Sequence, residues 1–291
     1  MLISGQTRLT GILGGVEQVK LSLSPAIHNA AFKDLQMDWV YLPFGAAPED
    51  LEPAIRGLAY AGVRGMNVTM PHKVPAMAVM DELAPSAQGI GALNTIEVRN
   101  GRLIGHNTDG DGLIRFLEWD VGVSLPSANA LVIGTGGSAR AAIAALGAAG
   151  VAHLCVLGRN AGRAEELRLV AGGVDFDAAD LKDDATRRVG QAGVIINATP
   201  VGQVNEPPVI PTDAISPGAV LVDLVYRPPV TPLIQAARNR GAIAHSGVGM
   251  LLHQAAISFE IWTGVEAPID AMSAAALWEL AKTAGAAHQR D

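Results

Sequence analysis

The chain has 291 residues, 49 % of them hydrophobic and 17 % charged, which predicts two folded domains and argues against disorder. The net charge of −7 argues against a nucleic-acid partner, because binding phosphates requires a basic face. The single cysteine, Cys155, excludes an intrachain disulfide, and the seven histidines lack the spacing of metal ligands, so we expect no metal.

Two stretches bear on targeting, and neither predicts a membrane segment. Residues 1–9 lack the apolar core of a signal peptide. Residues 141–158 are uncharged, but they are interrupted by Gly147 and Gly150 and owe their apolarity mostly to alanine and glycine. We therefore expect a cytoplasmic protein that does not contact the membrane.

In the first third, short apolar runs alternate with helix-like stretches, a pattern typical of a parallel sheet with crossover helices. The expected strands are 9–13, 39–44 and 65–68. Expected helices are 25–36, with Ser24 as N-cap and Pro25 in the first turn, then 48–60, then one that starts at Pro71.

A second alternating series begins near residue 128, and the chain becomes helical from residue 248 to its end. Its expected elements are strands 130–133, 153–157, 194–197 and 219–222 and a helix over 138–149. The predicted fold class is α/β with two lobes. We expect an α/β substrate lobe over 1–112, a Rossmann-like nucleotide-binding domain over 113–246, and C-terminal helices over 247–291 that return to the substrate lobe.

The strongest local signal is a glycine-rich turn between a predicted strand and a predicted helix. It reads Gly134-Thr135-Gly136-Gly137-Ser138-Ala139. Gly134 would allow the tight turn, Gly136 would let the backbone approach a pyrophosphate, and Ala139 would allow close helix packing. The helix N-terminus would add free N–H groups for the phosphates. We predict a dinucleotide site; the alternative is a purely structural turn.

The end of the following strand indicates which dinucleotide binds. NAD sites usually carry an acidic residue there for the ribose 2′-hydroxyl, but no Asp or Glu occurs between Asp120 and Glu165. Arg159, Asn160 and Arg163 stand there instead, and arginines suit a 2′-phosphate. We therefore predict NADP; the alternative is that both arginines are solvated surface charges.

Three polar segments of the first lobe lie at strand ends or helix starts, where ligands gather in α/β proteins. Capping would explain Ser24, Thr69 and Asn107 individually. Lys73 follows an apolar strand and could serve as the proton donor that a dehydrogenase needs, with Asp109 holding its ammonium. The alternative is a surface lysine. The three segments are 22–29, 67–73, and 94–95 with 105–110.

Together these segments resemble the shikimate dehydrogenase family. The matching motifs run in order through nearly the whole chain: Ser-x-Ser-Pro-x-x-His-Asn at 22–29, Asn-Val-Thr-x-Pro-His-Lys at 67–73, Gly-Ala-x-Asn-Thr at 91–95, Asn-Thr-Asp-Gly at 107–110, the glycine fingerprint at 134–140, Asn-Ala-Thr-Pro at 197–200, Asp-x-x-Tyr-x-Pro at 223–228 and Gly-x-Gly-Met-Leu-x-x-Gln at 247–254. The family fold implied is a substrate lobe made from both chain ends with a Rossmann-like lobe between them.

The resemblance also implies residue roles. Lys73 would be the catalytic acid/base, paired with Asp109. The substrate would be held by Ser22 and Ser24 at its carboxylate and elsewhere by Asn67, Thr69, Asn94, Asp109, Tyr226 and Gln254. NADP would be bound by Gly134, Thr135, Gly136, Gly137, Ser138, Arg159, Asn160 and Arg163, with Thr199, Val225, Gly247 and Met250 around the nicotinamide.

The activity implied is the reversible NADPH-dependent reduction of 3-dehydroshikimate to shikimate, a step of aromatic amino acid biosynthesis. Two alternatives stay open: a paralogue acting on quinate or an aminated relative, and a catalytically silent metabolite sensor. The expected partners are the small substrate and the cofactor, and the expected assembly is a monomer or homodimer. A short-chain dehydrogenase is excluded because no tyrosine is followed four residues later by lysine.

Substrate preference can be argued from the two serines. Ser22 and Ser24, spaced by one residue, would point to the same side of an extended segment and reach one carboxylate. Quinate carries an extra hydroxyl at the carbon that bears this carboxylate, and two full serine side chains leave little room for it. We therefore expect shikimate to be preferred over quinate by at least about tenfold.

Overall fold

The computed structural model describes residues 3–287, with side chains described up to residue 282. The chain divides into two compact units, Met1–Thr108 with Leu252–Asp291, and Asp109–Leu251, called here the first and second unit. We had placed the divisions after residues 112 and 246 instead. Helix α5 (Asp109–Arg115) packs against helix α6 of the second unit, and Met250 is buried in that unit's core. Both segments therefore belong with the second unit.

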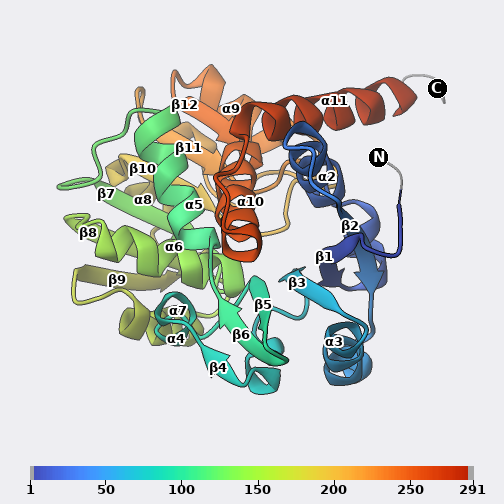
Figure 1. The fold of residues 1–291 in the computed structure, drawn as a ribbon. Helices are drawn as coiled ribbons and strands as arrows, with labels where there is room; N and C mark the ends of the chain where they lie inside the picture. Colours follow the sequence, from blue (N-terminus) through green and yellow to red (C-terminus); the bar gives the residue numbers. More distant parts are fainter. Residues whose placement is uncertain (1–2, 288–291) are drawn as a thin grey trace. The chain divides into compact units, whose positions relative to one another are not determined.

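The first unit is built on a mixed sheet with the strand order β2-β1-β3-β5-β6-β4 (Figure 1). Strands β1, β2 and β3 are parallel, β5 runs antiparallel to β3, and β6 runs antiparallel to β5. The strands are β1 (Arg8–Gly14), β2 (Trp39–Gly45), β3 (Val63–Val68), β4 (Glu82–Leu83), β5 (Thr95–Arg99) and β6 (Arg102–His106).

The β5–β6 hairpin was not foreseen, although the sequence carries its signal. The strands are joined by Asn100-Gly101, and both residues have positive φ, 53° and 78°. This is the backbone that a two-residue hairpin turn with right-handed twist requires. An Asn-Gly pair between two apolar runs predicts such a turn, so the sheet could have been recognised as mixed.

Helices cover this sheet, and α2 packs against the C-terminal helix α11. They are α1 (Val16–Lys20), α2 (Ser24–Asp34), α3 (Leu51–Tyr60), α4 (Pro85–Gln88), the first-unit part of α10 (Val248–Thr263), and α11 (Ile269–Ala287). The helix expected at Pro71 does not form: residues 70–74 are turns, followed by a 3₁₀ helix at Pro75–Val79. Pro75 has no N–H to donate to the carbonyl of Pro71, so an α-helix cannot run through it.

The second unit is a parallel sheet of six strands in the order β12-β11-β10-β7-β8-β9, with helices α5 to α9 around it (Figure 1). This is the Rossmann order, whose crevice lies where the order reverses, between β7 and β10. The strands are β7 (Asn129–Ile133), β8 (His153–Gly158), β9 (Asp175–Asp180), β10 (Val194–Asn197), β11 (Val220–Asp223) and β12 (Ile243–Ser246). The helices after α5 are α6 (Gly137–Ala148), α7 (Ala161–Glu165), α8 (Ala185–Gln191) and α9 (Pro232–Asn239).

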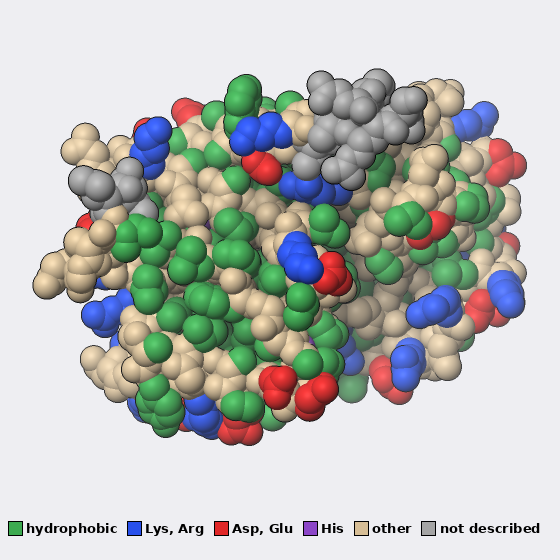
Figure 2. All heavy atoms as spheres, turned by 90° about the vertical axis from the view of Figure 1, so that its right-hand side faces the viewer, with side chains coloured by type: hydrophobic (Ala, Val, Ile, Leu, Met, Phe, Trp, Pro, Cys, Tyr) green, Lys and Arg blue, Asp and Glu red, His purple; other side chains and the backbone are tan. Residues whose placement is uncertain are grey.

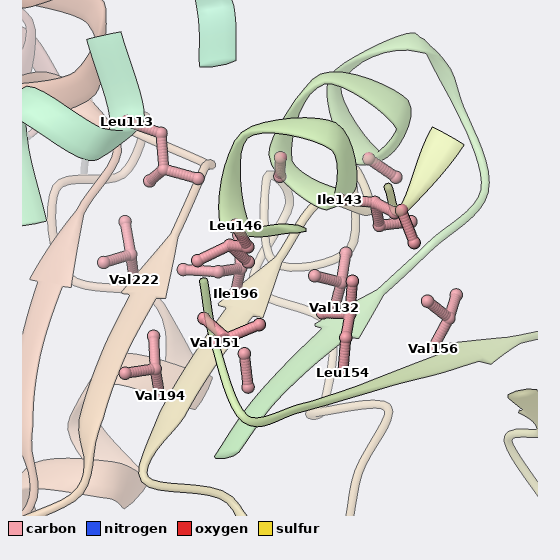
Figure 3. Close-up of a cluster of buried hydrophobic side chains, with 14 of the residues drawn as sticks. Leu113, Val132, Ile143, Leu146, Val151, Leu154, Val156, Val194, Ile196 and Val222 are labelled. Carbon is pink, nitrogen blue, oxygen red and sulfur yellow. The ribbon is translucent and has the colours of Figure 1, made fainter. Parts of the chain in front are cut away.

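One core of the second unit lies between the sheet and α6, where Ile143 and Leu146 meet Val132, Leu154 and Ile196 (Figure 3). Strands buried on both faces explain the continuous apolar runs in the sequence.

On the face drawn in Figure 2, basic side chains lie singly among acidic and hydrophobic ones. Within residues 3–287, none of the helices has the length and apolarity needed to cross a membrane.

Candidate functional site

In the first unit, the predicted site residues Thr69 and Lys73 follow the carboxyl end of β3. The backbone N–H of Thr69 donates to Leu13 O at 2.9 Å, and the Lys73 carbonyl accepts from Leu93 N at 2.9 Å. The next turn is anchored by His72, which is fully buried with its Nε2 3.0 Å from Ala46 O. Lys73 is half-buried. The turn therefore fixes the backbone of Lys73 at the end of β3.

The serine pair lies in a turn and not in an extended segment. Leu23, between the serines, has helical φ and ψ of −80° and −16°, and it is the N-cap of α2. Ser24 is the first helical residue, so our prediction of Ser24 as N-cap was wrong. The Ser22 hydroxyl instead accepts from Ser24 N–H at 3.1 Å. The capping hydroxyl thus comes from the residue before the helix turn, and the same-side argument for an extended chain does not apply.

Asn67 is the centre of a buried hydrogen-bond network. Its amide Nδ2 donates to Ser258 Oγ at 3.0 Å and Thr95 Oγ1 at 3.1 Å, and its Oδ1 accepts from Tyr41 Oη at 2.7 Å. Asn67 is 5 % exposed. Because both ends of the amide bind protein groups, Asn67 fixes the end of β3 rather than offering open donors.

The network continues to Asn94 and Gln254, two further predicted substrate ligands. Asn94 Nδ2 donates to Gln254 Oε1 at 3.0 Å and Thr108 Oγ1 at 2.9 Å, and Asn94 Oδ1 accepts from Thr108 N at 2.8 Å. Asn94, Thr108 and Gln254 are all buried. The structure thus brings together side chains from β3, the start of β5, the segment before α5, and α10.

A stacked pair of rings adjoins this network through Tyr41, which donates to Asn67. His28 lies parallel to Tyr41, with centroids 4.3 Å apart and planes 7° apart. Burial lowers the pKa of His28 to about 3, so the ring is neutral at physiological pH. Burial also raises the pKa of Tyr41 well above its usual value, which keeps the hydroxyl protonated as the donor to Asn67.

In the second unit, the glycine turn joins β7 to α6, as the fingerprint requires. Gly134 has φ of +117°, and a Cβ there would lie 3.1 Å from Ala198 O, so glycine is needed for the fold itself. Gly136 is the N-cap of α6 with φ of −83°, and a Cβ there would meet nothing within 4 Å. No protein atom demands glycine at 136, but a pyrophosphate approaching the helix N-terminus would fill that space.

The predicted 2′-phosphate residues follow β8. Arg159, Asn160 and Arg163 are exposed, and within residues 3–287 neither arginine forms a salt bridge. Asn160 caps α7 by accepting from Arg163 N at 3.0 Å, so it has a structural role beside the predicted one. Asp180, at the end of β9, stands in register with Gly158. The search for acidic residues that follow β8 in the sequence could not find Asp180, because the sheet brings it beside Gly158 from a later strand.

A second buried cluster joins the ends of β10 and β11. Asn197 Nδ2 donates to Asp223 Oδ1 at 2.8 Å, and Thr231 Oγ1 donates to Asp223 Oδ2 at 2.6 Å. Burial raises the pKa of Asp223, against the opposing effect of these hydrogen bonds. Asn197 Oδ1 accepts from Thr199 Oγ1 at 2.7 Å, and Asp223 Oδ1 accepts from Val225 N at 3.2 Å. The cluster therefore positions Thr199 and Val225, and its members were missed as functional support.

The remaining predicted residues have mixed explanations. A Cβ on Gly247 would lie 2.5 Å from Leu224 O, so glycine is required there by packing alone. Met250 is buried in the core of the second unit. Tyr226 is half-buried in the loop after β11, and Asp109, 4 % exposed, begins α5. Asp109 belongs to the second unit and Lys73 to the first, and their pairing stays a prediction.

The predicted ligands thus form one set per unit. In the first unit lie Ser22, Ser24, Asn67, Thr69, Lys73, Asn94 and Gln254; in the second lie Asp109, Gly134, Thr135, Gly136, Gly137, Ser138, Arg159, Asn160, Arg163, Thr199, Val225, Tyr226, Gly247 and Met250. Among the described residues, no three His, Cys, Asp or Glu side chains gather closely enough to hold a metal ion.

Family models match most of the chain, in the order of its two units. Residues 15–96 match the shikimate dehydrogenase substrate binding domain, 118–237 match shikimate / quinate 5-dehydrogenase, and 247–277 match the shikimate 5′-dehydrogenase C-terminal domain. A relative from Methanopyrus kandleri, shikimate dehydrogenase (NADP(+)), is 40 % identical over 285 residues, which cover 96 % of this chain and 98 % of the relative. The chain belongs to the shikimate dehydrogenase family.

Solved members of the family have the same fold. A shikimate dehydrogenase crystallised with NADP⁺ is 35 % identical with a TM-score of 0.88, covering 96 % of this chain and 98 % of that one. The shikimate 5-dehydrogenase of Thermus thermophilus, crystallised with NADP(H) and shikimate, is 34 % identical with a TM-score of 0.84, covering 93 % of this chain and 98 % of that one. The family's substrate lobe and Rossmann-like lobe correspond to the first and second units.

Proposed function

We propose that this chain catalyses the reversible NADPH-dependent reduction of 3-dehydroshikimate to shikimate. The observation that carries the proposal is the near-complete match to shikimate dehydrogenases that use NADP⁺, one of them crystallised with both NADP(H) and shikimate. The motifs that gave the resemblance lie at strand ends and helix starts of both units. A metabolite sensor would not need Lys73 and Asp109, and both are retained.

Lys73 is the proposed general acid. When bound, NADPH supplies the hydride to the ring carbonyl carbon. The Lys73 ammonium donates one proton to the carbonyl oxygen, which becomes the hydroxyl of the product, and in the reverse direction the neutral amine takes that proton back. Asp109 would hold the Lys73 side chain in position and accept a hydrogen bond from a substrate hydroxyl.

The other residues bind and orient the ring. Ser22 and Ser24 at the start of α2 would hold the carboxylate, where the helix dipole favours an anion. Thr69, Asn94, Gln254 and Tyr226 would hold the ring hydroxyls. For Asn67, the saturated amide favours a positioning role over direct contact.

The cofactor groups fit the second unit. The open space at Gly136 and the absence of acidic residues from the first turn of α6 suit a pyrophosphate. Arg159 and Arg163 would bind the 2′-phosphate, so NADP should be preferred over NAD in kcat/KM by at least about tenfold. Arg159→Ala should erase most of that preference, whereas Arg168→Ala, which removes an arginine paired with Glu165, should leave it intact.

The deciding experiment is a steady-state assay of shikimate and quinate with NADP and with NAD. We expect shikimate with NADP to give the highest kcat/KM and quinate to be at least about tenfold worse. Equal turnover of quinate would assign the chain to the quinate branch that the family description includes. No turnover of either substrate with either cofactor would support the sensor.

Two coarser expectations complete the proposal. We infer a cytoplasmic enzyme, because its cofactor and substrate are small water-soluble metabolites. We infer a monomer or homodimer, which light scattering after size-exclusion chromatography would distinguish from larger assemblies.

A further inference from the structure

The first unit has a pocket of about 200 Å³ at the end of its sheet where β1, β2 and β3 begin. The proposed substrate site is at the opposite end of these strands. The lining of the pocket comes from the first residues of β1 and β2, the start of β3, the middle of β5 and the end of α10. The lining residues are Arg8, Trp39, Arg64, Glu97, Val98 and Trp262. The strands β1 to β3 separate it from Thr69 and Lys73 by roughly 20 Å, the length of six or seven strand residues.

Two arginines of this pocket lack the acidic partner that three other described arginines of the unit have. Arg56, Arg99 and Arg102 each pair with a glutamate. Within residues 3–287, Arg8 and Arg64 form no salt bridge, and both are exposed. The unit therefore offers two uncompensated guanidinium groups at one pocket, a donor arrangement suited to a carboxylate.

Arg64 lies at an irregularity in the pairing of β1 with β3. Leu9 pairs with Val63 and Thr10 pairs with Gly65, so Arg64 is an extra residue in β3. Such a bulge re-aims a side chain and commonly accompanies a functional position. A Cβ on Gly65 would collide with Trp262 Nε1, so glycine there lets the indole pack against the strand beside Arg64.

The pocket also has aromatic walls. Trp39 and Trp262 both line it, and they are 5 % and 9 % exposed. Arg8 lies over the Trp39 ring, with Cζ 5.4 Å from the centroid. Trp262 Nε1 donates to Ile96 O at 3.0 Å, which fixes the ring plane. Fixed indoles beside guanidinium groups favour a flat aromatic ring that carries an anion.

The pocket's one carboxylate is already neutralised. Glu97 accepts from Arg99 Nε at 2.7 Å and Nη2 at 2.8 Å, and it lies 3.2 Å from His106 Nε2. It therefore does not cancel the charges of Arg8 and Arg64. We propose that this pocket binds a small planar aromatic carboxylate of about one ring, separately from the substrate site. A volume below that of drug-sized sites limits the ligand to a single ring.

Benzoate is the probe for this site, because it has one ring and one carboxylate. The four tryptophans provide an internal control: Trp39 and Trp262 line the pocket, whereas Trp119 and Trp278 are 67 % and 66 % exposed elsewhere. The full chain is titrated with benzoate, once without shikimate and once with shikimate saturating, and the four indole N–H signals are followed by NMR. We expect the Trp39 and Trp262 signals to shift with saturation and those of Trp119 and Trp278 to stay.

Matched ligands and variants test the chemistry. Benzamide, which lacks the charge, and cyclohexanecarboxylate, which lacks the flat ring, should each bind at least about fivefold more weakly. Arg64→Gln and Arg8→Gln should each weaken benzoate roughly tenfold, because each removes charge-assisted hydrogen bonds. Arg102→Gln, an exposed arginine of the same unit paired with Glu82, should change nothing.

Three results would overturn the site. The indole signals of Trp39 and Trp262 could fail to shift at benzoate concentrations up to tens of millimolar. Benzoate binding could disappear when shikimate saturates, which would place it at the substrate site. Arg64→Gln and Arg102→Gln could weaken binding equally, which would show only a general surface charge effect. None of these results bears on the dehydrogenase activity.

Discussion

The two units build their candidate sites from different material. In the second unit, the candidate cofactor site is made of backbone: five consecutive residues, 134–138, which form the turn after β7 and the start of α6, with glycine positions set by φ and open space. In the first unit, the candidate substrate site is made of side chains, and one hydrogen bond, from Asn67 to Ser258, joins residues 191 apart in sequence. A site made of backbone is set by a short stretch of sequence and tolerates substitutions around it. A site made of side chains depends on hydrogen bonds between residues that are far apart in the sequence.

The largest effect is expected at the side chain that does the chemistry. Lys73→Ala should lower kcat by ~10²–10⁴, the usual contribution of a general acid–base, with a smaller change in the shikimate KM. Steady-state kinetics at saturating NADP measures it. Lys33→Ala, an exposed lysine on α2, is the control and should be silent. Near-normal turnover of Lys73→Ala would return Lys73 to the class of surface lysines.

The same contrast explains what could be predicted from the sequence. The β7–turn–α6 unit was predicted closely because its signals lie within one short stretch. The strands buried on both faces were also found, since they read as continuous apolar runs. The first unit was only partly predicted: the β5–β6 hairpin was missed, and a helix was wrongly expected after Pro71.

The substrate network was beyond sequence reasoning for a physical reason. Motifs indicated Asn67 and Asn94 as polar residues at strand ends, but only the fold shows that Tyr41 and Ser258 saturate the Asn67 amide. Likewise, Ser22 replaced Ser24 as the capping side chain, because the turn before α2 is helical and not extended. Which polar groups satisfy one another is decided by tertiary contacts, and no local pattern encodes it.

A second prediction tests whether the first unit depends on its network. Tyr41→Phe removes the 2.7 Å donor to Asn67 and leaves a buried oxygen without that partner. We expect a loss of ~1–3 kcal/mol in stability, seen as a lower urea midpoint, and a raised KM for shikimate at unchanged KM for NADP. Tyr60→Phe, at a tyrosine that is 85 % exposed, is the matched control and should be neutral. If both variants behave alike, the network does not support the site.

A third prediction separates fold from ligand in the second unit. Gly134→Ala forces a side chain into φ of +117° and should cost ~1–3 kcal/mol in stability. Gly136→Ala meets open space and should lower the urea midpoint much less than Gly134→Ala, by no more than the cost of alanine at an N-cap, while raising the KM for NADP roughly tenfold, because its methyl group would occupy the approach to the pyrophosphate. An unchanged KM for NADP in Gly136→Ala would contradict the proposed position of the phosphates. A large loss of stability in the same variant would show that glycine is needed there by the fold.

The smallest effect concerns pH, and in the first unit it arises at His28. His28 has a pKa lowered to about 3 by burial, against 6.5 for an unperturbed histidine. Well above pH 6.5 the ring is neutral in both folded and unfolded chains, so its contribution to stability is complete. As pH falls below 6.5, His28 becomes protonated in the unfolded chain, whereas in the folded chain it stays neutral until about pH 3. The folded state therefore loses stability across this pH range.

The expected loss from His28 is about 1 kcal/mol between pH 6 and pH 5, since one proton per molecule changes stability by ~1.4 kcal/mol per pH unit once fully engaged. Urea midpoints measured at both pH values should show it for the unaltered chain. His28→Phe keeps a ring to stack on Tyr41 but cannot take up a proton, so its pH dependence should be shallower by that amount. His28→Gln tests the same point without an aromatic ring, in case phenylalanine packs poorly. If both variants keep the full pH dependence, the acid sensitivity of this unit lies with other groups, and the neutral ring is only a packing element beneath the network.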